Sequence, residues 1–517
     1  QFVLIASGGV ETGTSAGPFI VDASLTVTSD HDLLIAATND NYVLVNNAVT
    51  NIADRTTTIA ASNGAINING LVSSVGNVLV AGAGNATNDG VNINSNITVQ
   101  SGSAGASTVT VRANEDIRIT TPAAITTPVG GGGITVEAGV DLPGSTTSGA
   151  GDVTMVGVAT ISTSANNSDI SISTPAGGTN DIVLANVIAG TGTINVDAGG
   201  SINGDPSDVA HATATTLNLI SATGVGTSHP LLTSVSNLSA NGGNGGIDIE
   251  NEGALTIVGN AAVTGDADDG AVASAGDISI VAASPLTVAS NVTTAGDIVL
   301  EAGDTATPNV DNLTVNNGVT VQSTGGDVAL RAGDLADLVA GSTVSASGSL
   351  TITGGFDDAG DNGAVTINTA SLTSGSVASV EGGSGDDTIT IDAAPTAGLS
   401  LRGRAGDDNY IIALDAAASG TISINELSDS GADVASLTAT ANEDSIAVSS
   451  SQTTLTDGVT VSYDNGVETV NVQGGASDDE YTISLGSGNR TVTLQDSAGA
   501  EDDVIVNGTA DADTIGI

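Results

Sequence analysis

The chain has 517 residues, 69 of them glycine, but only four tyrosines and three phenylalanines supply aromatic rings. A compact globular core of this size normally contains many more rings, so the composition favours a narrow interior lined by small β-forming residues. Its 58 acidic residues outnumber seven arginines, lysine is absent, and the net charge of −51 should repel nucleic acid and anionic lipid head groups. The absence of cysteine excludes disulfides and thiolate metal sites.

Most of the acidic residues are aspartate, 46 against 12 glutamates. Aspartate forms turns and is a short-armed calcium ligand, so this excess indicates turns that attract divalent cations. Two alternatives are an acidic surface that only keeps the chain soluble and an adaptation to high salt.

The chain opens at Gln1–Ala6 in strand-like sequence, without a methionine or a signal peptide. It contains no apolar run long enough for a membrane-spanning helix, so no membrane insertion is expected. It ends at Ile517 within a repeat. We therefore expect a part of a longer polypeptide whose export and anchoring signals lie outside this segment.

Short segments in which apolar and polar residues alternate run through residues 1–370, separated by Gly, Asn, Asp and Ser. Examples are Tyr42–Val45, Ala65–Ile68 and Val109–Val111. A period of two residues predicts β-strands, and no stretch shows a helical period with caps. The segment 201–240 is less regular and predicts an insertion, in which His211 and His229 are interpreted as structural or surface residues.

A phrase of the type Gly-Asp-Ile-x-Leu-x-Ala-Gly recurs in this region, most clearly at Gly276–Ile280, Gly296–Gly303 and Gly326–Gly333. The second interval between copies is longer than the first and carries an insertion near Thr305–Pro308. Each copy predicts a turn followed by a strand, and such units at one coil's length indicate a solenoid. We therefore predict an all-β fold, a right-handed parallel β-helix (β-solenoid) with coils of about 20–30 residues. The apolar residues of the three phrases should line up on one face.

A second repeat begins near residue 371, where glycines are followed by Asp-Asp and an apolar residue or tyrosine. Its copies are Val380–Ile389, Leu401–Tyr410 and Val472–Tyr481, with degenerate copies at Ala441–Ile446 and Ala510–Ile515. The aspartates Asp408, Asp444, Asp479 and Asp513 recur at nearly equal intervals. We interpret residues 371–517 as an acidic Gly/Asp repeat region with rungs of about 35 residues, truncated within a repeat. A string of separate β-sandwich domains is the alternative.

Within this region Gly382–Thr390 matches the nonapeptide Gly-Gly-x-Gly-x-Asp-x-U-x, with U apolar, at every defined position, and it resembles the calcium-binding repeat of RTX proteins. The glycines allow a tight turn that exposes carbonyl groups, and the aspartate adds an anionic oxygen. Calcium takes about 6 to 8 oxygen ligands, so two adjacent turns must cooperate. The copies depart from the family because they are widely separated along the chain, whereas the family's nonapeptides follow one another directly.

The metal ligands implied by this resemblance are Asp386, Asp387, Asp407, Asp408, Asp478, Asp479 and Asp513, with Ca²⁺ as the ion. Stacking of Asp387 and Asp408 on successive turns gives the best candidate for a shared site. Plain Asp-Gly turns are the alternative for the other copies.

The coils of about residues 30–350 resemble the filamentous-haemagglutinin type of bacterial surface β-helix. The whole chain is similar to giant bacterial β-strand-repeat surface proteins that carry RTX-like turns. The resemblance implies an extracellular protein at the bacterial cell surface that serves as an adhesin, a fibre or a coat layer, with glycan as one potential partner. Unpaired edge strands at the ends of such a solenoid should promote self-association into a homopolymer.

Catalysis is not expected, because the chain has no lysine, its arginines are scattered, and it lacks a nucleophile elbow, a P-loop and a zinc signature. We predict an extracellular structural protein of a fibre, filament or coat layer, stabilised by calcium at its Gly/Asp turns. The alternatives are a calcium-dependent surface adhesin that binds glycan or another cell, and a β-helix enzyme that processes polysaccharide. The scarcity of aromatic residues counts against both alternatives, since sugar rings usually stack on Trp or Tyr.

Overall fold

The structure of the chain is a computed structural model. It describes residues 2–7, 19–28, 30–38, 42–62, 64–83, 90–100, 106–142, 150–177, 179–207, 209–305, 307–357, 363–368, 371–392, 398–414, 420–426, 431–455, 459–475, 477–484, 486, 490–495 and 502–508.

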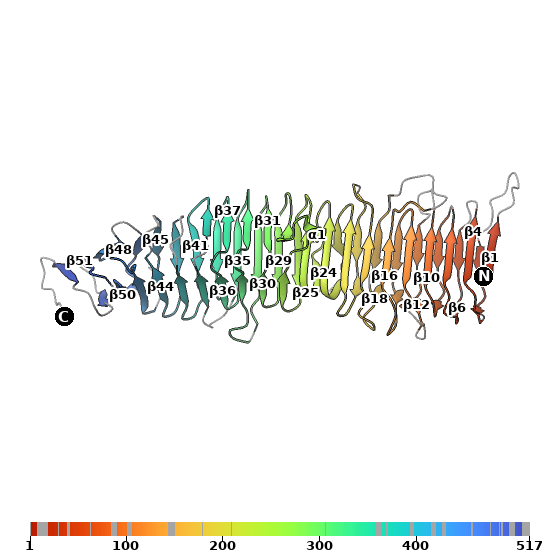
Figure 1. The fold of residues 1–517 in the computed structure, drawn as a ribbon, viewed down its shortest axis with the longest axis horizontal. Coiled ribbons are helices and arrows are strands. Elements are labelled where there is room, and N and C mark those ends of the chain that lie inside the picture. The colour runs from red at the N-terminus through yellow and green to blue at the C-terminus, as the bar shows by residue number, and fades with distance from the viewer. Residues whose placement is uncertain are drawn as a thin grey trace. The chain divides into compact units, whose positions relative to one another are not determined.

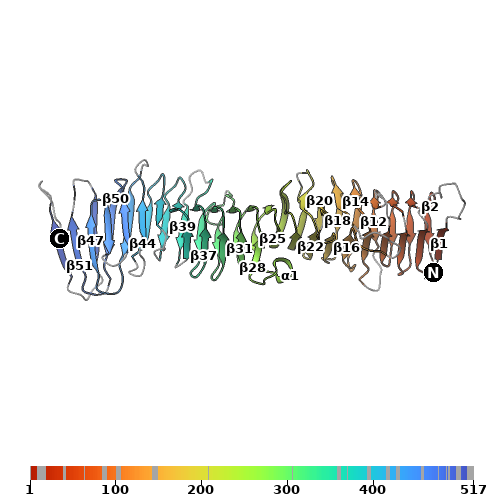
Figure 2. The same ribbon diagram turned by 90° about the horizontal axis from the view of Figure 1, so that it is seen from above.

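The chain divides into two compact units. Unit 1 comprises Gln1–Gly253, Asn260–Ala267 and Ala271–Gly276, and unit 2 comprises Ala254–Gly259, Asp268–Gly270 and Asp277–Ile517. Apart from one antiparallel strand of unit 2, β48 (Gln452–Leu455), the strands of each unit stack side by side in parallel, paired with strands of the neighbouring coils (Figures 1 and 2). The predicted all-β parallel β-helix is thereby confirmed.

Unit 1 has three faces, named A, B and C here. Face A contains β1 (Phe2–Ser7), β4 (Leu33–Thr38), β7 (Thr57–Ala61), β10 (Val78–Gly82), β13 (Val109–Ala113), β16 (Ile134–Glu137), β19 (Ile170–Ser173), β22 (Thr193–Ala198), β24 (Ala212–Ser221) and β25 (Leu231–Asn241). Face B contains β2 (Phe19–Val21), β5 (Val43–Val45), β8 (Ile66–Ile68), β11 (Val91–Ile93), β14 (Ile117–Thr120), β17 (Val153–Val156), β20 (Ile182–Leu184) and β23 (Ile202–Gly204). Face C contains β3 (Leu25–Val27), β6 (Val49–Asn51), β9 (Val72–Ser74), β12 (Ile97–Val99), β15 (Ala124–Thr126), β18 (Thr160–Ser162) and β21 (Asn186–Ile188).

The last part of unit 1 adds β26 (Ile247–Asn251), which pairs with β25, and the short helix α1 (Ala261–Thr264). Two residues of β28 (Asp269–Val272), Ala271 and Val272, also pair with β25. Helix α1, which the sequence did not predict, lies against β24 and β25.

Unit 2 begins with three faces, named D, E and F. Face D contains β27 (Leu255–Ile257), β30 (Leu286–Val288), β33 (Leu313–Val315), β36 (Leu335–Leu338), β39 (Ala364–Ile367), β42 (Thr388–Ile391), β44 (Asn409–Ala413), β46 (Asp433–Thr438), β50 (Val467–Gln473) and β52 (Thr491–Gln495). Face E contains β29 (Ile278–Ala282), β32 (Ile298–Ala302), β35 (Val328–Ala332), β38 (Leu350–Thr353), β41 (Ala378–Glu381), β43 (Leu399–Arg402), β45 (Thr421–Ile424) and β49 (Thr460–Tyr463). Face F contains β31 (Asn291–Thr294), β34 (Thr320–Ser323), β37 (Thr343–Ala346) and β40 (Ser371–Ser374).

The core of unit 2 is built from stacked aliphatic side chains, as the repeated phrase predicts. On face E, Leu300 pairs with Ile280 of the preceding coil and with Leu330 of the next, and all three side chains are fully buried. Alternate residues of each strand point outward, so every coil contributes the same inward positions. The phrases therefore stack in register although the intervals between them differ in length.

The aspartate of the phrase has a structural role at the corner that leads into face E. The Asp297 N–H donates to Asp277 Oδ1 at 2.8 Å, and the Asp327 N–H donates to Asp297 Oδ1 at 2.8 Å. Ser349 N–H continues the series to Asp327 at 2.7 Å. Each carboxylate thus ties its coil to the next one, which explains why Asp recurs before the strand.

Replacement of Asp297 by Ala should therefore destabilise unit 2, because the Asp327 N–H loses its acceptor. The bond is exposed to solvent, so its loss should cost about 0.5–1.5 kcal/mol, the range for an ordinary hydrogen bond. Asp297→Asn is the matched control, since an amide oxygen can accept the same bond and should keep most of the stability. Urea unfolding of both variants measures the difference, and equal loss in the two would contradict this role.

The segment 201–240, for which the sequence indicates an insertion, contains β23, β24 and β25 of the regular faces. Strand β24 pairs with β21 through Ala212 and Thr213 and with β22 through Thr216–Ser221. The alternation of buried and exposed residues shifts phase between these two parts. This phase shift hides the strand from a search for strict alternation.

The sequence analysis placed a domain boundary at residue 370. The strands of faces D and E continue to pair in the same way before and after this residue, whereas face F ends close to it, at β40. Beyond it, the described residues continue the parallel pairing of unit 2 and form no separate sandwich domains. A further ladder, β47 (Ser445–Ser449), β51 (Glu480–Ser484) and β53 (Asp503–Asn507), follows. The unpredicted β48 (Gln452–Leu455) joins β47 and β49 in antiparallel pairing.

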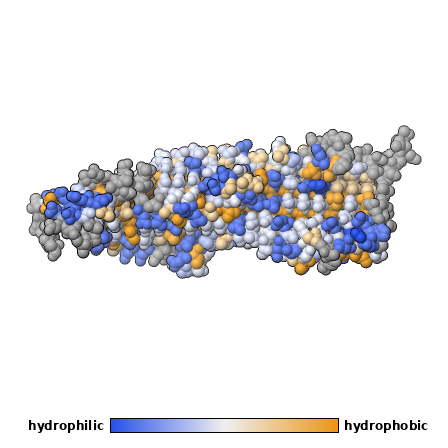
Figure 3. Space-filling view, viewed as in Figure 1, coloured by the Kyte–Doolittle hydropathy of each residue, from blue (hydrophilic) through white to orange (hydrophobic). Residues whose placement is uncertain are grey.

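In the described part of the chain, no helix has the length and apolarity needed to cross a membrane. On the face drawn in Figure 3, apolar residues form separate patches among hydrophilic ones. The exposed large apolar residues, such as Ile52, Val129 and Val377, come from different coils.

Candidate cation site in an acidic corner of unit 2

One corner of unit 2, which leads into face D, carries a column of acidic side chains on successive coils. The acidic corner consists of Asp311, Asp334, Asp387, Asp408, Asp433 and Glu468, with Gly363 between the second and the third. The five aspartates are at most 6% exposed. Buried carboxylates in this number require compensation, because removing a charge from water costs several kcal/mol.

Backbone amides supply part of that compensation. The Asp387 N–H donates to Asp408 Oδ1 at 2.8 Å, and the Asp408 N–H donates to Asp433 Oδ1 at 2.9 Å. Gly363 N–H binds Asp387 Oδ1 at 2.6 Å, and Asp433 N–H binds Glu468 Oε2 at 2.8 Å. The predicted stacking of Asp387 and Asp408 on successive turns is therefore present, as a hydrogen bond between the two coils.

The two members of each Asp-Asp pair face different surroundings. Asp386 and Asp407 are more exposed, whereas Asp387 and Asp408 are buried. The outer members form their own series, in which the Asp407 N–H donates to Asp386 Oδ1 at 2.8 Å and Ala432 N–H donates to Asp407 Oδ1 at 2.8 Å. The outer series runs in the opposite direction to the buried one, so an Asp-Asp pair ties its coil to both neighbours.

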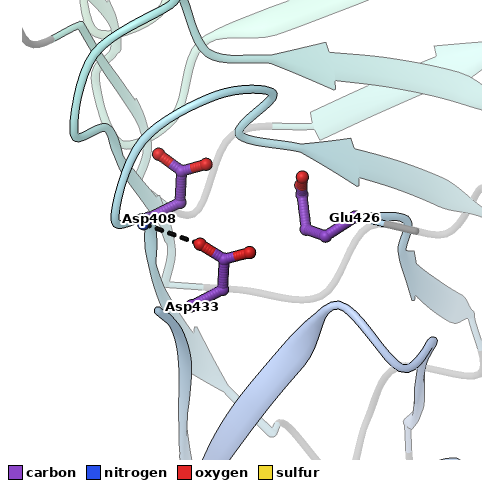
Figure 4. Close-up of side chains that lie close together, drawn as sticks. All are labelled: Asp408, Glu426 and Asp433. Carbon is purple, nitrogen blue, oxygen red and sulfur yellow. Dashed lines mark hydrogen bonds between the residues drawn. The ribbon is translucent and has the colours of Figure 1, made fainter. Parts of the chain in front are cut away.

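Three carboxylates approach one another where two successive coils of the acidic corner meet (Figure 4). Asp408 precedes β44, Glu426 follows β45, and Asp433 begins β46. Each offers a carboxylate oxygen within 4.8 Å of the others, and their exposures are 2%, 0% and 2%. We call Asp408, Glu426 and Asp433 the triad.

Glu426 is held in place by two donors. Gly403 N–H donates to Glu426 Oε1 at 2.6 Å, and the Tyr410 hydroxyl donates to the same oxygen. Burial raises the pKa of Tyr410, and the hydrogen bond to Glu426 raises it further, so this hydroxyl stays protonated and remains a donor. Gly403 is required here because an added Cβ would lie 2.0 Å from Asp408 Oδ2.

The triad has the chemistry of a site for a hard cation. Three carboxylates at such separations repel one another when ionised, and a cation or bound protons must balance them. Oxygen ligands suit calcium, magnesium or manganese rather than softer metals. The residues present therefore fit a divalent ion, and nothing in their geometry distinguishes among these three.

The structure places the seven predicted metal ligands in different surroundings. Asp408 belongs to the triad, and Asp387 adjoins it in the column. Asp479 lies in a second buried series, in which the Asp444 N–H donates to Asp479 Oδ1 at 2.8 Å and the Asp479 N–H donates to Asp502 Oδ1 at 2.9 Å. Asp386, Asp407 and Asp478 lie outside the buried columns, and Asp513 lies outside the described residues.

Glu426 and Asp433 were missed by the sequence analysis. Glu426 stands outside any Gly/Asp phrase, whereas Asp433 belongs to Gly431–Ala435, which matches only the second half of the nonapeptide, Gly-x-Asp-x-U. Asp433 does stand directly before the alternating run Val434–Thr438, which the sequence marks as a strand. This half-motif, directly before an alternating run, was thus a signal that could have found Asp433.

A second buried ionisable group, His211 of unit 1, is structural. Its Nδ1 accepts from the Leu232 N–H at 3.0 Å, and its Nε2 donates to the Asp205 carbonyl at 2.9 Å, so the ring is held neutral. The ring is fully buried and packs on Gly204, where an added Cβ would lie 2.1 Å from it. Burial lowers the pKa of His211 below its usual 6.5.

This lowered pKa predicts a loss of stability in mild acid. Between the lowered pKa and 6.5 the unfolded chain binds the proton and the folded ring does not, so the contribution of His211 is complete above about pH 6.5 and is lost as the pH falls below it. Urea midpoints at pH 8 and pH 5.5 should differ less in His211→Asn than in wild type. The exposed His31, replaced in the same way, is the control and should leave the difference unchanged.

Comparison of the chain with protein-family models, with curated proteins and with solved structures finds no match.

Proposed function

We propose that this chain is part of an extracellular structural protein, a fibre, filament or coat layer at a bacterial cell surface, whose coils are stabilised by calcium at the acidic corner. The proposal is supported by stacked parallel coils in both units, by an acidic composition with a net charge of −51, and by the triad. The triad is the single observation that carries the calcium part. Three carboxylates this buried are at odds with a purely solubilising role for the acids.

The mechanism is mechanical rather than chemical. Coils that contact only their neighbours pass load along the stack through their ladders of hydrogen bonds. Calcium at the triad would neutralise charge between β44, β45 and β46. Calcium at the outer aspartates would screen the repulsion between neighbouring copies of the chain and allow them to pack side by side.

Negative-stain microscopy of the purified chain, with millimolar calcium or with a chelator in its place, tests this function. We expect ordered polymers with calcium and dispersed particles with chelator. Sodium chloride at the same ionic strength, with chelator present, is the control for simple screening of charge.

Two outcomes would contradict the proposal. Particles that stay monomeric in both conditions and bind a cell-surface glycan would favour the adhesin. Turnover of a polysaccharide would favour the enzyme.

A further inference from the structure

Besides the triad, the acidic corner contains a pair of buried aspartates, Asp311 and Asp334. This pair lies in a part of the chain without any Gly/Asp nonapeptide. It lies beside the loop Gly303–Asn312, which joins β32 to β33 and makes that coil longer than the one before it. A loop of this length on a regular solenoid needs something to hold its conformation.

Asp311 closes the loop on itself. Its Oδ2 accepts from the Thr305 N–H at 2.7 Å and from the Thr305 Oγ1 hydroxyl at 2.8 Å. Asp334 on the next coil then accepts with Oδ2 from the Val310 N–H at 2.8 Å and from the Asp311 N–H at 2.7 Å. The Asp334 N–H returns a bond to the Asp311 carbonyl at 2.9 Å, so the backbone of Asp311 is bonded to Asp334 of the next coil in both directions.

The second carboxylate oxygen of Asp311, Oδ1, is not satisfied by any hydrogen bond from the described residues. Asp311 is fully buried, and among those residues its Oδ1 has no hydrogen-bond partner. Arg331, the nearest arginine in the sequence, is directed to Glu301 at 3.3 Å and stacks on the Phe356 ring at 4.8 Å. A buried acceptor left without a donor costs about 1–3 kcal/mol, and more when it is charged.

A cation satisfies the oxygen without a hydrogen bond. The carboxylate of Asp334, which accepts from the Asp311 N–H, is the neighbouring group that can supply a second hard ligand, and carbonyl groups and water can complete a calcium-type shell.

We propose that Asp311 and Asp334 form a second divalent-cation site of the calcium type, which fixes the loop Gly303–Asn312 to the coil below it. This site is independent of the triad. A cation at Asp311 and Asp334 would order one loop. A cation at the triad would instead connect the residues beside β44, β45 and β46.

Ion counting on the full chain tests the proposal. Equilibrium dialysis against calcium should show that Asp311→Asn binds one ion fewer than wild type. Asp392→Asn, at an exposed aspartate that follows β42, removes one acidic side chain outside the pair and should bind as many ions as wild type. Glu426→Gln should lose an ion of its own, and the two losses should add in the double variant.

Terbium separates the two sites by their surroundings. An ion at the triad lies beside Tyr410, which can excite it, whereas no tyrosine occurs between residues 43 and 409. Asp311→Asn should therefore reduce the number of bound terbium ions by one without changing the tyrosine-excited emission. Glu426→Gln should reduce that emission. A loss of emission in Glu426→Gln with an unchanged count in Asp311→Asn would overturn this site and leave the triad standing.

Wild-type protein provides a readout that needs no variant. Calcium should slow hydrogen exchange in the described part of the loop, residues 303–305 and 307–312. Exchange there that is the same with calcium and with chelator would overturn the proposal, because it would mean that water or another group satisfies Asp311.

Discussion

Chelation of divalent cations is expected to speed amide hydrogen exchange in β44, β45 and β46 while leaving β7 and β10 of unit 1 unchanged. The triad places carboxylate oxygens within 4.8 Å of one another at exposures of at most 2%. An ion that binds only the folded state, present at about 100 times its dissociation constant, stabilises by about 2.7 kcal/mol. Its removal should lower the free energy of unfolding of these coils by a similar amount.

Glu426→Gln makes the test specific. The replacement keeps an oxygen that can accept from Gly403 N–H and from the Tyr410 hydroxyl, and it removes one of three converging charges. With calcium, wild type should be the more stable protein, because it binds the ion more tightly. With chelator the order should reverse, because the variant has less repulsion.

Asp478, which lies outside the triad, provides the control, since Asp478→Asn changes the net charge equally and should not reverse any order. Urea unfolding followed by hydrogen exchange of β43–β46 gives both stabilities. The same ranking in calcium and in chelator would show that the triad is balanced by protons rather than by a cation.

Leu300→Ala is expected to destabilise unit 2 by about 2–5 kcal/mol, the range for leucine deletions in packed cores. Leu300 is fully buried between Ile280 and Leu330, which belong to the coils on either side. A cavity at this position removes contacts with both neighbours. Because each coil of a solenoid is stabilised by its neighbours, the loss should extend to β29 and β35.

The adjacent Val299 is the matched control, since it points outward and is only partly buried. Val299→Ala should cost less than about 1 kcal/mol. Unfolding midpoints in urea, together with hydrogen exchange of β29, β32 and β35, measure both effects. Equal costs for the two variants would contradict the inward and outward assignment of the repeated phrase.

The repeated phrase contained enough information to predict the core of unit 2. Its Asp marks a corner, its alternating Ile and Leu mark the inward face, and its spacing gives the coil length, because these features depend only on period and turn chemistry. The same reasoning was weaker where the period changed. In β24 the alternation shifts phase within a single strand, and in β48 an antiparallel strand interrupts the coils.

For the candidate site, the sequence identified only Asp408 of the triad. The Gly/Asp phrase marks a residue by its local turn, and Asp433 carries only half of that phrase. Glu426 carries none of it and reaches the same place by the length of the coil that precedes it. Asp444 and Asp479, which are 35 residues apart, are hydrogen-bonded to each other. Asp408 instead meets Asp433, which comes earlier in the chain than Asp444.

The sequence by itself therefore determined what each coil is made of: strands of period two, corners of glycine and aspartate, and an interior of small aliphatic residues. Only the tertiary structure decided which corners meet, because insertions make each coil a different length, and stacking depends on the register of whole strands. The buried carboxylates show this most clearly. Their separation in space is set by hydrogen bonds between coils, and no local pattern of residues records it.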